Sequence, residues 1–382
     1  MENSKLVSFE NLPSFFYIEL DIEFRNHLFN EARNNRLWAE LAKDVGYSRD
    51  RLFCLRRGFR NLHNKKEKNM INVELVKQLA KIAGITLEKI EKHIIFVKSG
   101  DGGRPISLKL PIYESKELAS LIAHEMGDGH LRERTFVYFN ESQRLIDGVK
   151  TNIKKVFGNI NPKEYRDEKG TRLVYPAVIS RIIFLCGGVR FNKVTQDFDI
   201  PKWIKEGSDE IKISFIRSIF DDESYVNIED KYITFQMASV DYCKKMMISL
   251  KKLLKDFDIN TLLRHKGSYI DKENIKKNVF GITLGRFESI NNYKTIIGFN
   301  HSEKQRQLEE LIESYGQAKF IKYESIEKMI VDNMNAKNLL TINTLKNELN
   351  MTHGRVRTHL NSLYRKGIVN KSEKHPIMWR VR

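Results

Sequence analysis

The chain has 382 residues, and its 66 Lys and Arg against 49 Asp and Glu give a formal net charge of +17. A chain of this length can form two or three domains, each with its own core. No apolar run approaches the roughly 18 residues of a membrane span, and the first residues lack the basic-then-apolar order of a signal peptide. The positive charge favours a polyanionic partner, with nucleic acid first, over a merely soluble basic surface.

Cysteine usage indicates an intracellular protein. The three cysteines are isolated and lack metal-ligand spacing, so we expect them to be reduced. They are Cys54, Cys186 and Cys243. With the basic charge, this predicts a cytoplasmic, nucleoid-associated protein.

Residues 1–108 are predicted to form a small helical domain followed by a linker. The segment is polar and helical in pattern from about Asp21, with helices expected at Val73–Ile82 and Leu87–His93. Ser99–Pro105 is rich in glycine, so we assign it to the linker.

Within this domain, Trp38–Gly58 has the spacing of a helix-turn-helix. Gly46 falls where the turn needs a left-handed residue, and Ser48 can cap the second helix. Leu52 and Leu55 would then face inward. The basic residues expected to point outward, toward phosphates and base edges, are Arg49, Arg51, Arg56 and Arg57. An ordinary helical hairpin with a solvated basic face is the alternative.

Residues 109–205 and 206–320 are predicted to form two similar halves. Each half opens with an apolar helix that ends in an acid, Asp128 in the first and Glu223 in the second. A helix macrodipole disfavours negative charge at the C-terminal end, so we expect these acids to serve chemistry, with a cation nearby. Small residues four apart would let a second helix approach closely, and they are Ala119, Ala123 and Gly127.

Each half continues in a similar order, although one strand of each is not visible in the sequence. The first half is expected to have a strand at Arg134–Asn140, a helix at Ser142–Phe157, strands at Lys163–Arg166 and Thr171–Ile179, and a short helix ending near Gly187. The second half is expected to have a strand at Tyr232–Gln236, a helix at Val240–Phe257, strands at Thr261–His265 and Asn278–Gly285, and a helix near Phe287–Tyr293. The predicted fold is therefore α+β, with a tandem αββαββα repeat.

Residues 321–382 are predicted to form a winged-helix module. A helix with Ile326 and Ile330 on one face precedes a second at Thr341–Leu349, and Thr352 caps a third. The segments after the third helix, Lys366–Asn370 and Met378–Arg382, can pair as a wing. The basic residues expected to point outward toward DNA are Arg355, Arg357 and Arg365. A dimerisation or packing module is the alternative.

The two acid-ended helices, Leu121–Gly129 and Ile216–Ser224, resemble the LAGLIDADG motif of homing endonucleases. The resemblance covers roughly residues 110–315 and is stronger at the first motif. Gly188–Lys193 looks like the family's linker between repeats, and Ile297–Lys304 looks like its closing segment. The resemblance implies two helices packed on a pseudo-twofold axis and two curved antiparallel sheets that form a saddle over the DNA major groove.

By position, the resemblance implies that Asp128 and Glu223 bind Mg²⁺ (or Mn²⁺) beneath the scissile phosphates. Asn140 and Gln236, at the end of the first strand of each half, match residues that position the attacking water. Lys193 and Lys304 match residues that stabilise charge on the phosphate. Mg²⁺ prefers carboxylate, phosphate oxygen and water. The implied function is a site-specific endonuclease for double-stranded DNA, acting as a monomer with internal pseudo-twofold symmetry.

Four positions depart from the family pattern. Glu223 stands where the family has Asp, a change that keeps a carboxylate and does not argue against metal binding. Ser224 replaces a glycine, Asp222 replaces a small residue of the helix interface, and Glu125 occupies a position that is often apolar. The last three would weaken the second half-site. The alternative is therefore a catalytically degenerate core in a DNA-binding transcriptional regulator, although both acids are kept in register, which favours an active nuclease.

Two further alternatives concern the substrate and the type of chain. Folded RNA is a possible substrate, as for family members that assist intron splicing. A complete intein is not expected, because splicing needs a nucleophile at residue 1 and a His-Asn pair at the end, whereas this chain runs from Met1 to Arg382.

Overall fold

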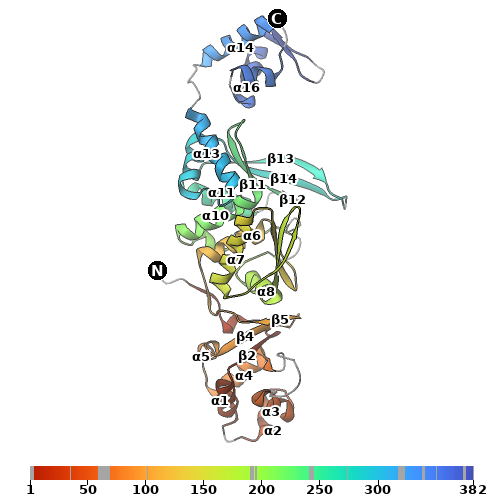
Figure 1. Ribbon diagram of the computed structural model, residues 1–382, viewed down its shortest axis with the longest axis vertical. Helices are drawn as coiled ribbons and strands as arrows, with labels where there is room; N and C mark the ends of the chain where they lie inside the picture. Colours follow the sequence, from red (N-terminus) through yellow and green to blue (C-terminus); the bar gives the residue numbers. More distant parts are fainter. Residues whose placement is uncertain are drawn as a thin grey trace. The chain divides into compact units, whose positions relative to one another are not determined.

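The computed structural model describes residues 4–34, 36–58, 69–100, 102–189, 193, 196–240, 245–272, 274–316, 323–337, 340–349, 351–372 and 376–381. The chain divides into two compact units: unit 1 is Met1–Glu223, Met237–Leu253 and Lys266–Phe280, and unit 2 is Ser224–Gln236, Leu254–His265 and Gly281–Arg382. The fold combines helices with antiparallel sheets, so the predicted α+β class is confirmed (Figure 1).

Two expectations from composition can be compared with these residues. Among their helices, none has the length and apolar character that crossing a bilayer requires. Cys54 and Cys186 are free thiols, while Cys243 lies outside the described residues.

The N-terminal domain contains a sheet that the prediction of a purely helical domain missed. Its helices are α1 (Ile22–Arg33), α2 (Trp38–Asp44), α3 (Arg49–Arg57), α4 (Val73–Ala83) and α5 (Leu87–Glu91). Its sheet has the order β3 (Ile71–Asn72), β2 (Phe16–Leu20), β4 (Ile94–Ser99) and β5 (Gly102–Ile106). In β2 the buried residues alternate, which is the pattern of a strand with one buried face. The assignment of Ser99–Pro105 to a linker was therefore wrong, because Ser99 pairs with Gly102 in a β-hairpin.

The helix-turn-helix pattern has its expected local structure in α2 and α3. Gly46 is left-handed with φ +69. The hydroxyl of Ser48 accepts a hydrogen bond from the Arg51 N–H, at 3.3 Å. Leu52 and Leu55 are buried. The glycine of the turn and the capping serine thus predicted the local structure of this part of the domain correctly.

Near the N-terminus, β1 (Lys5–Val7) is followed by the short 3-10 helix η1 (Phe9–Asn11). β1 pairs with β6 (Ile112–Tyr113), the strand that leads into the first repeat. The repeat contains α6 (Lys116–Met126), β7 (Gly129–Leu131), β8 (Thr135–Asn140), α7 (Gln143–Phe157), β9 (Lys163–Asp167), β10 (Gly170–Pro176) and α8 (Ala177–Leu185). The strand hidden from sequence reasoning is β7, which begins directly after Asp128. The strand predicted to reach Ile179 ends instead at Pro176, because proline has no N–H for the ladder and α8 starts at the next residue.

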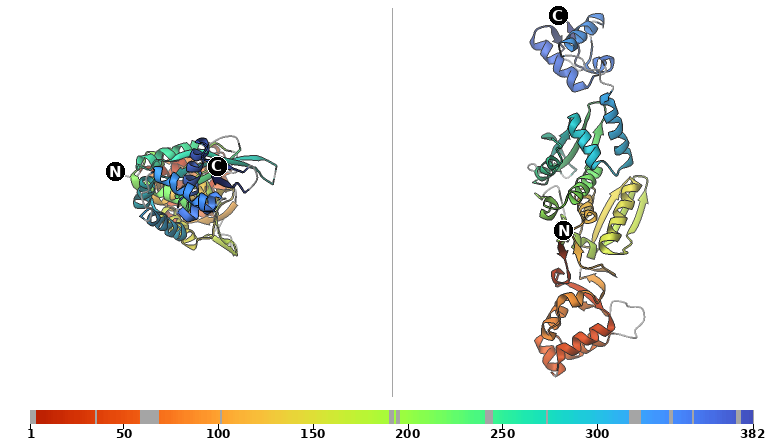
Figure 2. Two further views of the ribbon diagram at one scale, coloured as in Figure 1. Left: turned by 90° about the horizontal axis from the view of Figure 1, so that it is seen from above. Right: turned by 90° about the vertical axis from the view of Figure 1, so that its left-hand side faces the viewer.

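The first sheet has the strand order β7-β8-β10-β9. Phe136, Tyr138, Leu173 and Tyr175 are buried on one face, where α7 and α8 pack against β8 and β10. The other face is not covered by these helices (Figure 2). A sheet with one face on the core leaves its second face available for binding.

The second repeat has the same element order. It contains α10 (Asp209–Glu223), β11 (Ser224–Asn227), β12 (Tyr232–Ser239), α11 (Lys245–Asp256), β13 (Leu262–Ile270), β14 (Lys276–Leu284) and α12 (Phe287–Asn292). Its strand order, β11-β12-β14-β13, repeats that of the first sheet, and its hidden strand β11 begins directly after Glu223. The short α9 (Lys202–Lys205) precedes it, and η3 (Tyr293–Ile297) and α13 (Ser302–Gly316) follow. The predicted helix at Val240–Phe257 lies partly outside the described residues, at 241–244.

The C-terminal module has the predicted order of three helices and a wing. These are α14 (Tyr323–Lys337), α15 (Ile342–Leu349), α16 (His353–Arg365), β15 (Val369–Lys371) and β16 (Trp379–Val381). Thr352 caps α16 by accepting from the Arg355 N–H at 3.3 Å. Val356, Leu360 and Leu363 are buried in a core that includes Trp379 of the wing.

Candidate active site and nucleic-acid interface

The candidate site lies where α6 and α10 end together. The two helices run parallel, because contacts repeat with a constant offset along them: Ser214 Oγ donates to Lys116 O at 2.7 Å, and Ser120 Oγ lies 2.7 Å from Ser218 Oγ. Every residue of α6 from Leu118 to Met126 is buried. Parallel packing brings both negative dipole ends to one place, so acids there need nearby donors or cations.

Asp128 lies exposed just beyond the end of α6. Its Oδ2 accepts a hydrogen bond from Asn140 Nδ2 at 2.8 Å. Asn140 is buried at the end of β8, and its Oδ1 accepts from the Ser142 N–H at 2.8 Å. Asn140 is therefore oriented by the chain and holds the Asp128 carboxylate in place.

Lys193 supplies the cation expected at the end of α6. Its Nζ lies within hydrogen-bond distance of four carbonyl oxygens, which share its three N–H donors. They are those of Glu125 at 2.8 Å, Met126 at 3.0 Å, Gly127 and Gly129. The carbonyls of Glu125, Met126 and Gly127 are ones that the helix end leaves without intrahelical partners, whereas Gly129 begins β7. Burial lowers the pKa of Lys193, whereas the carboxylates of Glu125 and Glu223 act in the opposite direction. An ammonium at this position offsets both the helix dipole and the acids.

Asp222 belongs to the site, although the sequence indicated it only as a departure from the LAGLIDADG pattern. Its side chain is fully buried, and it lies 3.0 Å from His124 Nδ1. It also accepts from Tyr138 Oη at 2.9 Å and from the Asp128 N–H at 3.4 Å. Gly127 makes room for it, since a Cβ at position 127 would stand 2.7 Å from the Asp222 Cβ. Asp222 thus joins the two helix ends instead of facing solvent.

Two buried titratable groups support this junction. For His124, burial would lower the pKa, but the Asp222 carboxylate outweighs it and the pKa is raised. For Glu125, burial raises the pKa to about 7. Glu125 Oε2 accepts from the Val189 N–H at 2.9 Å, and within the described residues its Oε1 has no hydrogen-bond partner.

Glu223 occupies the position equivalent to Asp128, since each directly precedes the first strand of its repeat. The equivalence of Asn140 with Gln236 was wrong. Gly129 opposes Tyr138, and Ser224 opposes Phe235. Gln236 therefore corresponds to the residue before Asn140, on the opposite face of its strand. It does not end β12, which continues to Ser239.

Lys304 lies in unit 2, in the first turn of α13, where its N–H donates to His301 Nδ1 at 3.4 Å. Gln236 also belongs to unit 2. Within unit 1, the residues brought together around the end of α6 are Asp128, Asn140 and Lys193, with Glu223 acting electrostatically on Lys193.

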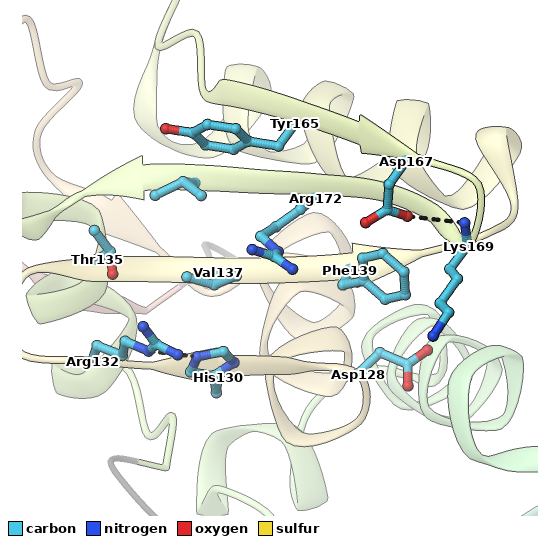
Figure 3. Close-up of a pocket in the computed structure, with 11 residues that line it drawn as sticks. Asp128, His130, Arg132, Thr135, Val137, Phe139, Tyr165, Asp167, Lys169 and Arg172 are labelled. Carbon is cyan, nitrogen blue, oxygen red and sulfur yellow. Dashed lines mark hydrogen bonds between the residues drawn. The ribbon is translucent and has the colours of Figure 1, made fainter.

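The open face of the first sheet forms a groove of about 830 Å³ that ends at Asp128 (Figure 3). Its lining residues alternate along the strands, as one face of a sheet requires. They are Asp128, His130, Arg132, Thr135, Val137, Phe139, Tyr165, Asp167, Lys169, Arg172 and Val174. Apart from Asp128, sequence reasoning did not name these residues, because the face of the sheet to which each side chain points depends on strand register. Cations, two aromatic rings and small apolar side chains on one face suit a nucleic-acid surface.

The groove also has internal order. Arg132 Nε donates to His130 Nε2 at 2.9 Å, which fits a neutral imidazole. Burial and then the neighbouring Arg132 lower the pKa of His130. The hairpin turn is fixed by the Lys169 N–H, which donates to Asp167 Oδ1 at 2.9 Å.

The basic residues of the flanking modules are mostly exposed. Arg49, Arg51 and Arg57 are exposed on α3. Arg56 was predicted to point outward, but it is half-buried and its guanidinium lies 5.7 Å from the centre of the Trp38 ring. Stacking on an aromatic ring explains this position.

In the C-terminal module, Arg355, Arg357 and Arg365 are exposed on α16, as expected. Arg357 also lines a cleft between α15, α16 and the wing, together with Asn343 and Lys371.

Comparison with known proteins gives distant similarities. No protein-family model matches the chain. It is 26% identical over 253 residues to the glutamine–fructose-6-phosphate aminotransferase (isomerizing) of Methanocaldococcus jannaschii, covering 63% of this chain and 21% of that protein. It is 26% identical over 181 residues to the replication factor C small subunit of the same organism, covering 41% of this chain and 10% of that protein. The chain thus spans about a fifth and a tenth of the lengths of these relatives.

Proposed function

We propose that the protein is a site-specific, metal-dependent endonuclease for double-stranded DNA, of the LAGLIDADG homing type. The observation that carries the proposal is that Asp128, at the joint end of two packed parallel helices, opens onto a groove lined by cations. The repeated strand order, with each first strand beginning directly after an acid, supports a tandem LAGLIDADG saddle.

The donors at this end suit Mg²⁺ or Mn²⁺. Asp128 is exposed and Glu223 half-buried, so both can offer oxygen ligands, whereas Asp222 is buried and already accepts three hydrogen bonds. Within the described part of the chain, no group of three or more His, Cys, Asp or Glu is arranged to hold a metal. Mg²⁺ is commonly held by one or two carboxylates, with phosphate oxygens and water completing its shell.

Each residue then has a defined task. A bound Mg²⁺ would supply Lewis acidity and lower the pKa of a water molecule. Asn140 orients Asp128 through its 2.8 Å hydrogen bond. Lys193 keeps positive charge close to the acids, where a phosphate would gain negative charge. Arg132 and Arg172 of the groove would contact the DNA backbone or bases.

The activities named for the two relatives are not carried over to this chain. It spans only about a fifth of the aminotransferase and a tenth of the replication factor C subunit. A segment of that size can be shared while the rest of each protein carries the named activity.

Cleavage of a randomised duplex library in the presence of Mg²⁺, followed by sequencing of the ends, tests the proposal. We expect cuts at one site, and a loss of at least about 100-fold on Asp128→Asn, since a metal ligand contributes several kcal/mol. Glu133→Gln is the matched control, because it removes one exposed negative charge close to β8 without touching the acids. No cleavage, or cleavage unchanged by Asp128→Asn, would refute the proposal.

A transcriptional regulator with a catalytically degenerate core is the second candidate. The burial of Asp222 against His124 favours it, because one acid of α10 then serves to join the helices. This candidate predicts tight, salt-sensitive duplex binding without cleavage, and a larger loss of affinity from Arg357→Ala than from Asp128→Asn. Unchanged affinity after deletion of residues 321–382 would exclude it. Competition with structured RNA would show whether RNA is the preferred substrate.

A further inference from the structure

A second, smaller hollow lies at the end of the first sheet, beside the β4–β5 hairpin of the N-terminal domain. Its volume is about 250 Å³, and it is lined by Gly103, Arg104, Arg134, Thr135, Lys163, Val174, Tyr175 and Pro176. Thr135 and Val174 also line the groove described above. The two hollows therefore adjoin at these residues, and both belong to unit 1.

Three cations reach this hollow from separate parts of the chain. Arg104 comes from β5, Arg134 from the turn between β7 and β8, and Lys163 from the start of β9. Lys163 is paired with Val174 in the β9–β10 ladder, so its side chain is on the groove face. Arg104 is held by a hydrogen bond from Nη2 to Asn161 O, at 2.9 Å.

The backbone beside these cations lies next to the first repeat. Gly103 has φ +88, in the left-handed region that favours glycine. A Cβ there would stand 3.9 Å from the Ala177 N atom at the start of α8. The hairpin thus packs next to the first repeat and carries Arg104 to the end of its sheet.

Within the described residues, no carboxylate of the lining offsets the charge of the hollow. None of the described side chains that line it is acidic. Glu164, the neighbour of Lys163, is engaged with Lys150 at 2.8 Å. Arg104, Arg134 and Lys163 are all exposed. Like charges gathered in one place repel each other, and an anion that contacts all of them relieves that repulsion.

The chemistry of the lining selects phosphate. Two guanidinium groups and an ammonium offer many N–H donors to an anion with several oxygen acceptors. A volume of about 250 Å³ exceeds several-fold the roughly 30 Å³ share of one water molecule, so a phosphate group fits. Because Thr135 and Val174 line both hollows, a ligand bound in the groove would place its next phosphate here.

We propose that this hollow binds one backbone phosphate of the duplex whose adjoining segment occupies the groove of the first sheet. The proposal rests on the proposed function only in requiring that a duplex is bound. The β4–β5 hairpin would then extend the contact beyond the repeat and help to fix the register of the protein on its site.

Duplex binding by the full chain, measured at several salt concentrations, tests the proposal. The variant is Arg134→Ala/Lys163→Ala, which leaves Arg104 and its bond to Asn161 intact. We expect the slope of log K against log salt to become shallower by about 0.9, the value for one phosphate contact. The matched control is Lys154→Ala/Lys251→Ala, which removes two exposed charges from α7 and α11 and should leave the slope unchanged.

The outcomes separate this proposal from the proposed function. Equal slopes for the variant, the control and the wild type overturn the phosphate site, whether or not the wild type cuts DNA. If inorganic phosphate raises the melting temperature of the wild type but not of the variant while the slopes stay equal, the hollow serves free phosphate and the assignment to the duplex is overturned. Absence of any duplex binding by the wild type refutes the proposed function itself, and the duplex assignment fails with it.

Discussion

Replacing Asp222 with Asn tests whether the buried junction holds the two helix ends together. Asp222 faces three donors: His124 Nδ1 at 3.0 Å, Tyr138 Oη at 2.9 Å and the Asp128 N–H at 3.4 Å. Asn has nearly the same volume but loses the charge, and its amide N–H₂ must point at one of these donors. Breaking a buried ion pair by changing one partner costs about 3–5 kcal/mol, so we expect a loss of that size.

The loss should depend on pH. The pKa of His124 is raised in the folded chain by the Asp222 carboxylate, against the effect of burial. A raised pKa contributes stability that is fully present below the unfolded value of about 6.5 and is lost as pH rises through the folded value. The advantage of the wild type over Asp222→Asn should therefore be largest at pH 6 and smaller at pH 9. Its slope cannot exceed about 1.4 kcal/mol per pH unit for one proton.

Hydrogen exchange of the α6 amides, read by mass spectrometry at the two pH values, gives the local opening free energy without assuming two-state unfolding of the whole chain. Asp209→Asn is the control, since it changes an exposed acid at the other end of α10 and should cost at most about 1 kcal/mol. An Asp222→Asn loss below about 1 kcal/mol at pH 6 would refute the reasoning. So would a loss that is the same at both pH values.

Three further predictions concern packing and protonation. Gly127→Ala should destabilise unit 1 by about 1–3 kcal/mol in denaturant titrations, because its Cβ would stand 2.7 Å from the Asp222 Cβ. Gly148→Ala is the control: a Cβ there would have nothing within 4 Å, so the change should be neutral or stabilising. Burial raises the pKa of Glu125 from 4.5 to about 7. The stability that the protonated side chain contributes is therefore complete below pH 4.5 and is lost as pH rises through 7. Glu125→Gln should abolish this decline, which is worth about 1.4 kcal/mol per pKa unit, and an equal decline in the variant would disprove the assignment. Leu360→Ala, at a fully buried position of the C-terminal module, should cost about 2–5 kcal/mol, detected as loss of exchange protection in α16 with none in α6.

Sequence by itself determined the elements whose signals are local. The capping side chains of Ser48 and Thr352 accept hydrogen bonds from N–H groups three residues further on, so the helix starts were predicted correctly. The acid at the end of each repeat's first helix, and the repeated order of strands, could also be found from residue patterns. The sheet of the N-terminal domain was missed because β2 is separated by a long stretch of helices from its partner β4.

Tertiary structure alone decided which groups meet at the candidate site. His124 and Asp222 are 98 residues apart, and so are Ser120 and Ser218, so no local period predicts either contact. The face of the sheet to which Gln236 points depended on strand register, because a shift of one residue moves a side chain to the other face. Lys193 was found by resemblance, but its role as the cation at the end of α6 follows only from the carbonyl groups that converge on its ammonium. Local patterns specify helices and their caps, whereas burial and long-range hydrogen bonds select the partners of each charge.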